Sequence, residues 1–154
     1  VDPYYLSHKS IKLNINPKVI LSGRKTNDEM PSFIAGKIDK ILKKRSKILF
    51  LGITFKEDVP DLRNSKSFDV INFLKKKKHI VRIHDPFISK GKYKTIDFNS
   101  IKKNEFDGIV IAVPHKFYLN IINRIKDFVK PNGFIFDIKG RIKFKKENIN
   151  YWSL

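Results

Sequence analysis

The chain has 154 residues, the size of one ordinary domain and enough to bury a hydrophobic core. It contains no Cys, which excludes a disulfide framework, a thiolate metal site and a thiol nucleophile within this sequence. Its net charge of +18 would suit a nucleic-acid or anionic-membrane partner, but the Lys residues are spread along the whole chain, so we expect neither of those partners.

The first third of the chain predicts an irregular start and then one long helix. Residues 1–26 contain Pro3 and Pro17, and we expect them to be irregular. Because there is no initial Met and no signal pattern, we expect the sequence to begin inside a longer protein. From Asn27 onward apolar side chains recur at helical spacing, which predicts a helix over residues 28–44.

Strand and helix patterns alternate from residue 47 onward. The predicted strands cover 47–55, 79–86, 107–115 and 134–140, the last of which ends the sheet, and 95–98 could add a short strand. The predicted helices cover 65–76 and 118–129, and residues 131–133 form a turn. Continuous apolar strands separated by helices indicate an α/β fold, a Rossmann-like doubly wound parallel sheet with helices on both faces.

Basic side chains follow several of these strands. In a doubly wound sheet, ligands bind outside the carboxyl ends of the strands. We therefore expect Lys56, His115, Lys116 and Lys139 to lie along one rim, although a lone His after a strand is more often structural and His115 receives no role. The first strand is followed by a single Gly52 without G-x-G-x-x-G, so this part should not be the primary NAD domain.

The segment FKEDVPDLRNS (55–65) allows two interpretations. Lys56 offers a point charge and Arg63 a planar fork, both suited to phosphate or carboxylate, while Asn64 and Ser65 can cap the next helix. Alternatively, the charges pair with one another in a solvated loop, where such pairs contribute little. Composition and spacing leave both interpretations open.

Several motifs carry a resemblance to a known family. They are VDPYYLSHKS (1–10), VILSGRKTNDEMPSFIAGK (19–37), GITFKEDVPDLRNSKSFDVI (52–71), HDPF (84–87), VIAVPHKFY (110–118) and FDIKG (136–140). With them the sequence resembles the UDP-glucose/GDP-mannose dehydrogenase family, in the branch that oxidises UDP-N-acetylhexosamines to uronic acids. The match runs through nearly the whole chain, in order.

The resemblance implies a C-terminal fragment of a cytoplasmic, homodimeric enzyme of surface polysaccharide synthesis. Residues 1–45 would be the end of a central dimerisation region with a long helix, and residues 46–154 the UDP-sugar-binding Rossmann-like domain. One NAD, bound mainly by an absent N-terminal domain, would take a hydride from the C6 alcohol of the sugar to give the aldehyde, and a second NAD would take a second hydride after a thiolate has added to that aldehyde. A Cys thiolate just upstream of Val1 would carry the acyl intermediate, so the fragment alone should be inactive.

The resemblance also implies roles for individual residues. Asp2 would orient or activate the hydrolytic water in catalysis, and Arg63 would contact NAD. The implied substrate-binding residues are Phe55, Lys56, Lys139 and Arg24, the last of which could instead lie between subunits. The UDP-glucose branch tends to have Arg at the position of Lys139, which leaves the role of that contact open, and Lys25 and Thr26 leave the choice of sugar open. UDP-glucose is an alternative substrate, and a catalytically inactive module for UDP-sugar binding or dimerisation is an alternative function.

Overall fold

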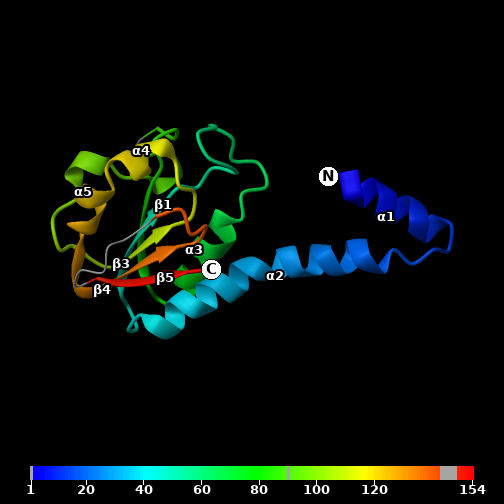
Figure 1. The fold of residues 1–154 in the computed structure, drawn as a ribbon, viewed down its shortest axis with the longest axis horizontal. Helices are drawn as coiled ribbons and strands as arrows, with labels where there is room; N and C mark the ends of the chain where they lie inside the picture. The colour runs from blue at the N-terminus through cyan, green and yellow to red at the C-terminus, as the bar shows by residue number, and fades with distance from the viewer. Residues whose placement is uncertain (1, 90, 143–148) are drawn as a thin grey trace.

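The computed structural model describes residues 2–89, 91–142 and 149–154 and forms one twisted parallel sheet with flanking helices (Figure 1). The strand order is β2-β1-β3-β4-β5, and every neighbouring pair is parallel. The strands are β1 (Lys47–Leu51), β2 (Ile80–His84), β3 (Phe106–Ile111), β4 (Val129–Asp137) and β5 (Asn150–Ser153). The predicted Rossmann-like fold is confirmed, and the direction of the strand order reverses between β1 and β3.

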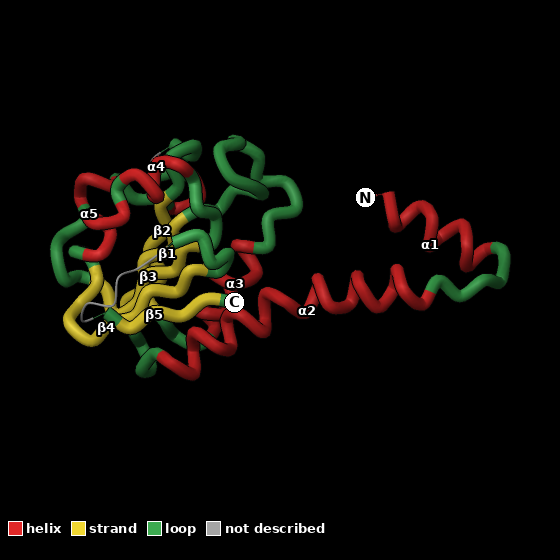
Figure 2. The backbone as a smooth tube through the Cα atoms, in the orientation of Figure 1, coloured by secondary structure: helices red, strands yellow, loops and turns green. Residues whose placement is uncertain are grey.

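Helices cover both faces of the sheet (Figure 2). They are α1 (Asp2–Lys12), α2 (Lys18–Ile41), α3 (Ser67–Lys76), α4 (Lys116–Asn120) and α5 (Ile122–Lys126), with 3-10 turns at Lys92–Lys94 and Phe98–Ser100. Alternate residues of β1 point to opposite faces, as the pleat requires. Ile48 and Phe50 pack with α2 and α3, whereas Leu49 and Leu51 pack with α4 and α5.

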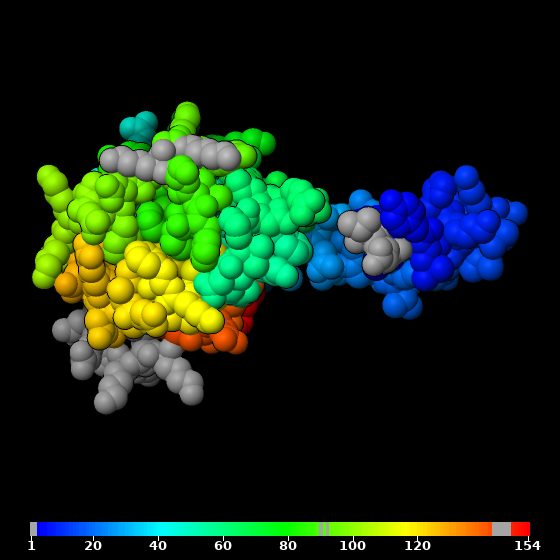
Figure 3. All heavy atoms as spheres, turned by 90° about the horizontal axis from the view of Figure 1, so that it is seen from above, coloured from blue at the N-terminus to red at the C-terminus, as the bar shows by residue number. Residues whose placement is uncertain are grey.

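The two N-terminal helices form a hairpin that projects from the sheet domain (Figure 3). We call residues 2–29 the arm. Its apolar side chains are largely solvent-exposed, namely Tyr4, Tyr5, Leu6, Ile11, Leu13, Ile15, Val19 and Leu21. The second half of α2 differs, because Pro31, Ile34, Ala35 and Ile38 are buried against the sheet. One helix therefore belongs half to the arm and half to the core.

The irregular start predicted for residues 1–26 is wrong, since α1 and the first turns of α2 occupy most of it. Pro3 lies in the first turn of α1, where its missing N–H has no helical partner to lose. Pro17 directly precedes α2 as its N-cap residue. Both prolines stand at helix starts, and α2 begins at Lys18 instead of residue 28.

Three predictions about the second half of the chain need correction. The helix predicted over 118–129 is two short helices, separated at Ile121. The strand after residue 134 is not the last, because the exposed edge strand β5 follows it. The residues of the predicted turn at 131–133 lie inside β4, where Pro131 and Asn132 are exposed, Gly133 is buried and Asn132 has a φ of 62°. The segment 95–98 contributes a single bridge from Thr95 to Ile83.

Candidate functional site

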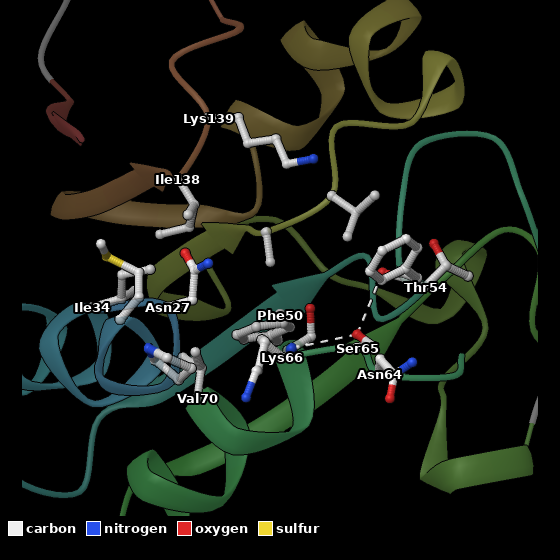
Figure 4. A pocket seen from close by; sticks show the side chains of 16 residues that line it. Asn27, Ile34, Phe50, Thr54, Asn64, Ser65, Lys66, Val70, Ile138 and Lys139 are labelled. Carbon is white, nitrogen blue, oxygen red and sulfur yellow. Dashed lines mark hydrogen bonds between the residues drawn. The ribbon is translucent and has the colours of Figure 1, made fainter. Parts of the chain in front are cut away.

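A cavity of about 300 Å³ opens at the carboxyl ends of β1 and β3, where the strand order reverses (Figure 4). This is the place at which doubly wound sheets bind ligands. Its walls are mainly apolar: Met30, Pro31, Ile34, Phe50, Val70, Ala112, Val113 and Ile138. The polar and cationic groups are Asn27, Thr54, Asn64, Ser65, Lys66, Ser67 and Lys139, with Phe55 completing the lining.

The start of α3 forms one side of the cavity. Asn64 takes the left-handed conformation, with a φ of 58°, which Asn tolerates better than most residues. Ser65 Oγ accepts a hydrogen bond from the Ser67 N–H and donates one to the Thr54 carbonyl, each at 3.4 Å. α3 begins at Ser67, two residues after the predicted start, and its N-cap residue is Lys66 instead of Asn64 or Ser65.

The loop of residues 54–58 lies beside the start of α3, and its residues Thr54 and Phe55 line the cavity. Phe55 is 55% exposed and lines the cavity, and its N–H donates to the Asp61 carbonyl at 2.6 Å. Lys56 lies next to it on the loop but is not among the described lining residues. Glu57 Oε1 accepts a hydrogen bond from Lys139 Nζ at 2.6 Å. This contact holds the pKa of Glu57 below its usual value and joins the loop to the end of β4.

The rim predicted from the strand ends is present. Asp58 donates its N–H to His115 Nδ1 at 2.9 Å, and its carboxylate accepts the Lys116 N–H at 3.0 Å. With the Glu57–Lys139 pair, these bonds bring the segments after β1, β3 and β4 together. His115 itself is completely buried, which agrees with a structural place for it and excludes direct contact with a ligand.

Asp85, which follows β2, anchors the start of the same loop. Its Oδ2 accepts the Ile53 N–H at 2.7 Å and the Thr54 N–H at 3.2 Å, and its Oδ1 accepts the Phe87 N–H. Burial alone would raise the pKa of Asp85. Hydrogen bonds from His115 and from these backbone groups outweigh burial and lower it, so the buried carboxylate stays charged.

Arg63 projects into solvent beside the cavity mouth, with its side chain 87% exposed. Its Nε and Nη2 donate to the carboxylate of Asp61, at 3.1 and 2.9 Å. These bonds, with a smaller effect of Lys56, lower the pKa of Asp61 to about 2. The pairing of charges within the loop, one of the two interpretations of this segment, is therefore present here, and the cavity lies next to it.

The remaining predicted residues lie on the arm. The Arg24 guanidinium stacks 3.5 Å from the centroid of the Tyr4 ring and pairs with Asp28 at 3.4 Å. Asp28 also accepts a hydrogen bond from Lys66, at 3.0 Å, so these two residues connect Arg24 to the cavity lining. Asp2 begins α1, and its side chain lies outside the part of the chain whose side chains the structure describes.

The contribution of α2 to the cavity was missed from the sequence. Asn27, Met30, Pro31 and Ile34 follow the i, i+3, i+4, i+7 spacing of one helical face. That spacing predicts packing against the sheet, and the sequence does not show that the sheet leaves part of this helical face open. In the described residues we find no cluster of His, Asp and Glu able to hold a metal ion. None of the described helices combines the length and apolar character that crossing a bilayer requires.

Comparison with known proteins identifies relatives of this chain. Residues 49–144 match the family described as the UDP-glucose/GDP-mannose dehydrogenase family, UDP binding domain. Protein CapL from Staphylococcus aureus is 38% identical over an alignment that covers 100% of this chain and 39% of the relative. UDP-N-acetyl-D-glucosamine 6-dehydrogenase from Salmonella typhi is 35% identical, covering 90% of the chain and 35% of the relative. The chain therefore spans between one third and two fifths of these relatives.

A solved structure agrees with the fold. The UDP-D-ManNAc dehydrogenase from Pyrococcus horikoshii superposes with a TM-score of 0.81 and 26% sequence identity, over 99% of this chain and 36% of that one. Because the superposition includes nearly all of this chain, it takes in the arm as well as the sheet domain.

Proposed function

The chain belongs to the UDP-glucose/GDP-mannose dehydrogenase family, and on this basis we propose that it is the UDP-sugar-binding part of an NAD-dependent 6-dehydrogenase. The substrate is a UDP-N-acetylhexosamine, whose C6 alcohol is oxidised in two steps to the uronic acid for surface polysaccharide synthesis. The names of the relatives from Salmonella typhi and Pyrococcus horikoshii favour an acetamido sugar over UDP-glucose. In this proposal the enzyme works in the cytoplasm.

The observation that carries the proposal is the composition of the cavity. Its walls are apolar and can pack against a planar base, whereas Lys139 and Lys66 lie on its lining and can meet a diphosphate. The side chain of Lys139 reaches across the opening from the end of β4 (Figure 4). An apolar cavity with cations beside it suits a nucleotide with a charged tail.

We assign the division of the chain in the same way. Residues 46–154 form the UDP-sugar-binding domain, and residues 1–45 are the end of the central, dimerising region. The boundary follows directly after α2, whose exposed first half carries the arm. The exposed apolar side chains of the arm support a homodimer, since a contiguous apolar surface of this kind is unfavourable in water.

Each predicted residue has a role in the proposal. Phe55 packs on the nucleotide, and Lys56 and Lys139 neutralise phosphate or hold the reacting end of the sugar. Arg24, on the arm, contacts either the substrate or a second subunit. Asp2 orients the water that releases the acyl group from a Cys thiolate supplied upstream of Val1.

NAD supplies the hydride acceptor when it is bound. Its site lies mainly in a region outside this sequence, and Arg63 is the residue of this chain placed to contact it. The exposed guanidinium keeps one edge available although Asp61 holds the other, which fits an anionic dinucleotide. Because the chain lacks Cys and a dinucleotide fingerprint, the chain alone should show no dehydrogenase activity.

Calorimetric titration of this chain with UDP, GDP and AMP tests the proposal. UDP should bind, and Lys139→Ala should weaken binding about tenfold or more, because a charge-assisted contact to phosphate is lost. Lys76→Ala, at the far end of α3, is the matched control and should bind UDP like the wild type. Absence of UDP binding, or equal binding of all three nucleotides, would contradict the proposed function.

Kinetics of the full-length enzyme test the role of Lys56. Lys56→Ala should lower turnover on the UDP-sugar severely without changing the thermal melting temperature, because the residue is exposed. Wild-type kinetics in this variant would remove Lys56 from the site. Sedimentation tests the dimer: Val19→Lys, at a side chain that is 84% exposed on the arm, should shift the chain toward the monomer.

A further inference from the structure

The buried ring of His115 joins three strand ends that lie far apart in the sequence. Its Nδ1 accepts the N–H of Asp58 at 2.9 Å, from the loop after β1. Its Nε2 lies 3.1 Å from Thr54 Oγ1, at the start of that loop, and 3.2 Å from Asp85 Oδ2, after β2. His115 itself follows β3 and is fully buried.

The surrounding hydrogen bonds determine which nitrogen of the ring carries the proton. A backbone N–H can only donate, so Nδ1 must accept from Asp58 and carries no proton. Thr54 gives its own hydroxyl proton to the Lys56 carbonyl at 3.1 Å, so its oxygen accepts from His115. The proton therefore lies on Nε2 and is shared between Thr54 and Asp85. The ring is neutral, with an acceptor on one side and a donor on the other.

These bonds fix the loop at both ends. Asp85 holds its start through the N–H groups of Ile53 and Thr54, and His115 holds its end through Asp58. Asp58 has a φ of 56°, a conformation that is unfavourable for a residue with a side chain and needs support from its surroundings. Its support comes from His115 and from the Lys116 N–H.

We infer that His115 is a positioning residue, which together with Asp85 holds residues 54–58 so that Phe55 lines the nucleotide cavity and Glu57 reaches Lys139. The importance of this loop for binding rests on the proposed function. The hydrogen bonds that hold the loop are present whatever the function of the chain is. His115 touches no ligand in this arrangement, because the loop covers it.

Two substitutions separate the two sides of the ring. In His115→Asn the amide oxygen can replace Nδ1 and accept from Asp58, and in His115→Gln the amide nitrogen can replace Nε2 and donate to Thr54 and Asp85. His79→Asn is the matched control, because His79 is also buried and pairs with Asp39 at 3.0 Å, away from the cavity.

Two measurements follow the loop: the UDP dissociation constant and the hydrogen-exchange rate of the amides of residues 53–58. His115→Gln should weaken UDP binding roughly tenfold and speed exchange at Asp58, because the buried N–H loses its acceptor. His115→Asn should restore both values most of the way to wild type. His79→Asn should lower the melting temperature and leave both values unchanged, which separates positioning from general destabilisation.

The inference is overturned if His115→Gln shows wild-type UDP affinity and wild-type exchange at Asp58, or if His115→Asn is no closer to wild type than His115→Gln. If even the wild type does not bind UDP, the proposed function fails. The exchange rates of the same variants then decide the positioning role by themselves.

Discussion

Replacement of Gly52 by Ala tests how closely the end of β1 approaches the segment after β3. Gly52 has a φ of +88°, a region that side chains disfavour. A Cβ at this position would lie 2.6 Å from both the Cβ and the carbonyl oxygen of Val113 and 2.8 Å from its nitrogen. Two of these atoms belong to the backbone, so the contact cannot be relieved by rotating a side chain.

The expected loss of stability has two parts. The left-handed backbone costs an L-residue about 1–2 kcal/mol, and overpacking against fixed atoms costs a further ~1–3 kcal/mol. Together they predict a loss of about 2–5 kcal/mol in the free energy of unfolding. Ala substitutions at two other glycines separate the backbone cost from the overpacking cost. Gly91, at φ +81° with open space around it, carries only the backbone cost, and Gly36, inside α2 and also unobstructed, should gain ~0.5–1 kcal/mol as Ala.

Urea unfolding followed by circular dichroism measures all three variants. With a urea dependence of about 1–3 kcal/mol per molar, Gly52→Ala should lower the midpoint by roughly 0.7–5 M and Gly91→Ala by less. Gly36→Ala should raise it slightly. An equal loss in Gly52→Ala and Gly91→Ala would mean that the contact with Val113 contributes nothing. An unchanged midpoint for Gly52→Ala would refute the close approach itself.

Three further outcomes concern charged and titratable side chains. Glu57→Gln should tighten UDP binding of the chain, because Lys139 then binds phosphate without first breaking its ion pair with the Glu57 carboxylate. Weaker binding in this variant would show that the ion pair is needed to form the site. Burial lowers the pKa of His84 to about 4 from 6.5, so between pH 6.5 and 4 the unfolded chain takes up a proton that the folded chain does not. Stability should therefore fall over that range by up to ~3 kcal/mol, and urea midpoints at pH 7 and 4.5 should differ less in His84→Asn than in wild type. Arg63→Ala should raise the NAD requirement of the full-length enzyme and leave UDP binding of the chain unchanged, and an unaltered NAD dependence would exclude the dinucleotide contact.

The core of the fold could be predicted because its signals are local and strong. The apolar runs of β1 and β3 are buried on both faces, and such runs identify parallel strands without any tertiary information. The edge strand β5 carries a weaker signal, because it is only four residues long and only partly buried. The irregular start expected from Pro3 and Pro17 is wrong because a sequence alone does not distinguish a proline that ends a helix from one that begins it.

The candidate site was predictable in its place but not in its connections. The rim of strand ends followed from topology, and Phe55 and Lys139 do line the cavity. The Glu57–Lys139 contact joins residues 82 positions apart, and local sequence patterns cannot predict a contact over such a separation. The same holds for His115, whose three partners come from two other strand ends.

Pro31 lies inside the long helix α2 and makes it easier to bend at that position. A proline inside a helix removes one hydrogen bond and crowds the carbonyl four residues earlier, which here belongs to Asn27. The helix is therefore least stiff between these residues, where the exposed arm meets the half that is packed on the sheet. Asn27 and Pro31 both line the cavity, so a molecule seated there touches this hinge directly. A molecule bound in the cavity would therefore contact the helical turn at which the arm can bend relative to the sheet domain.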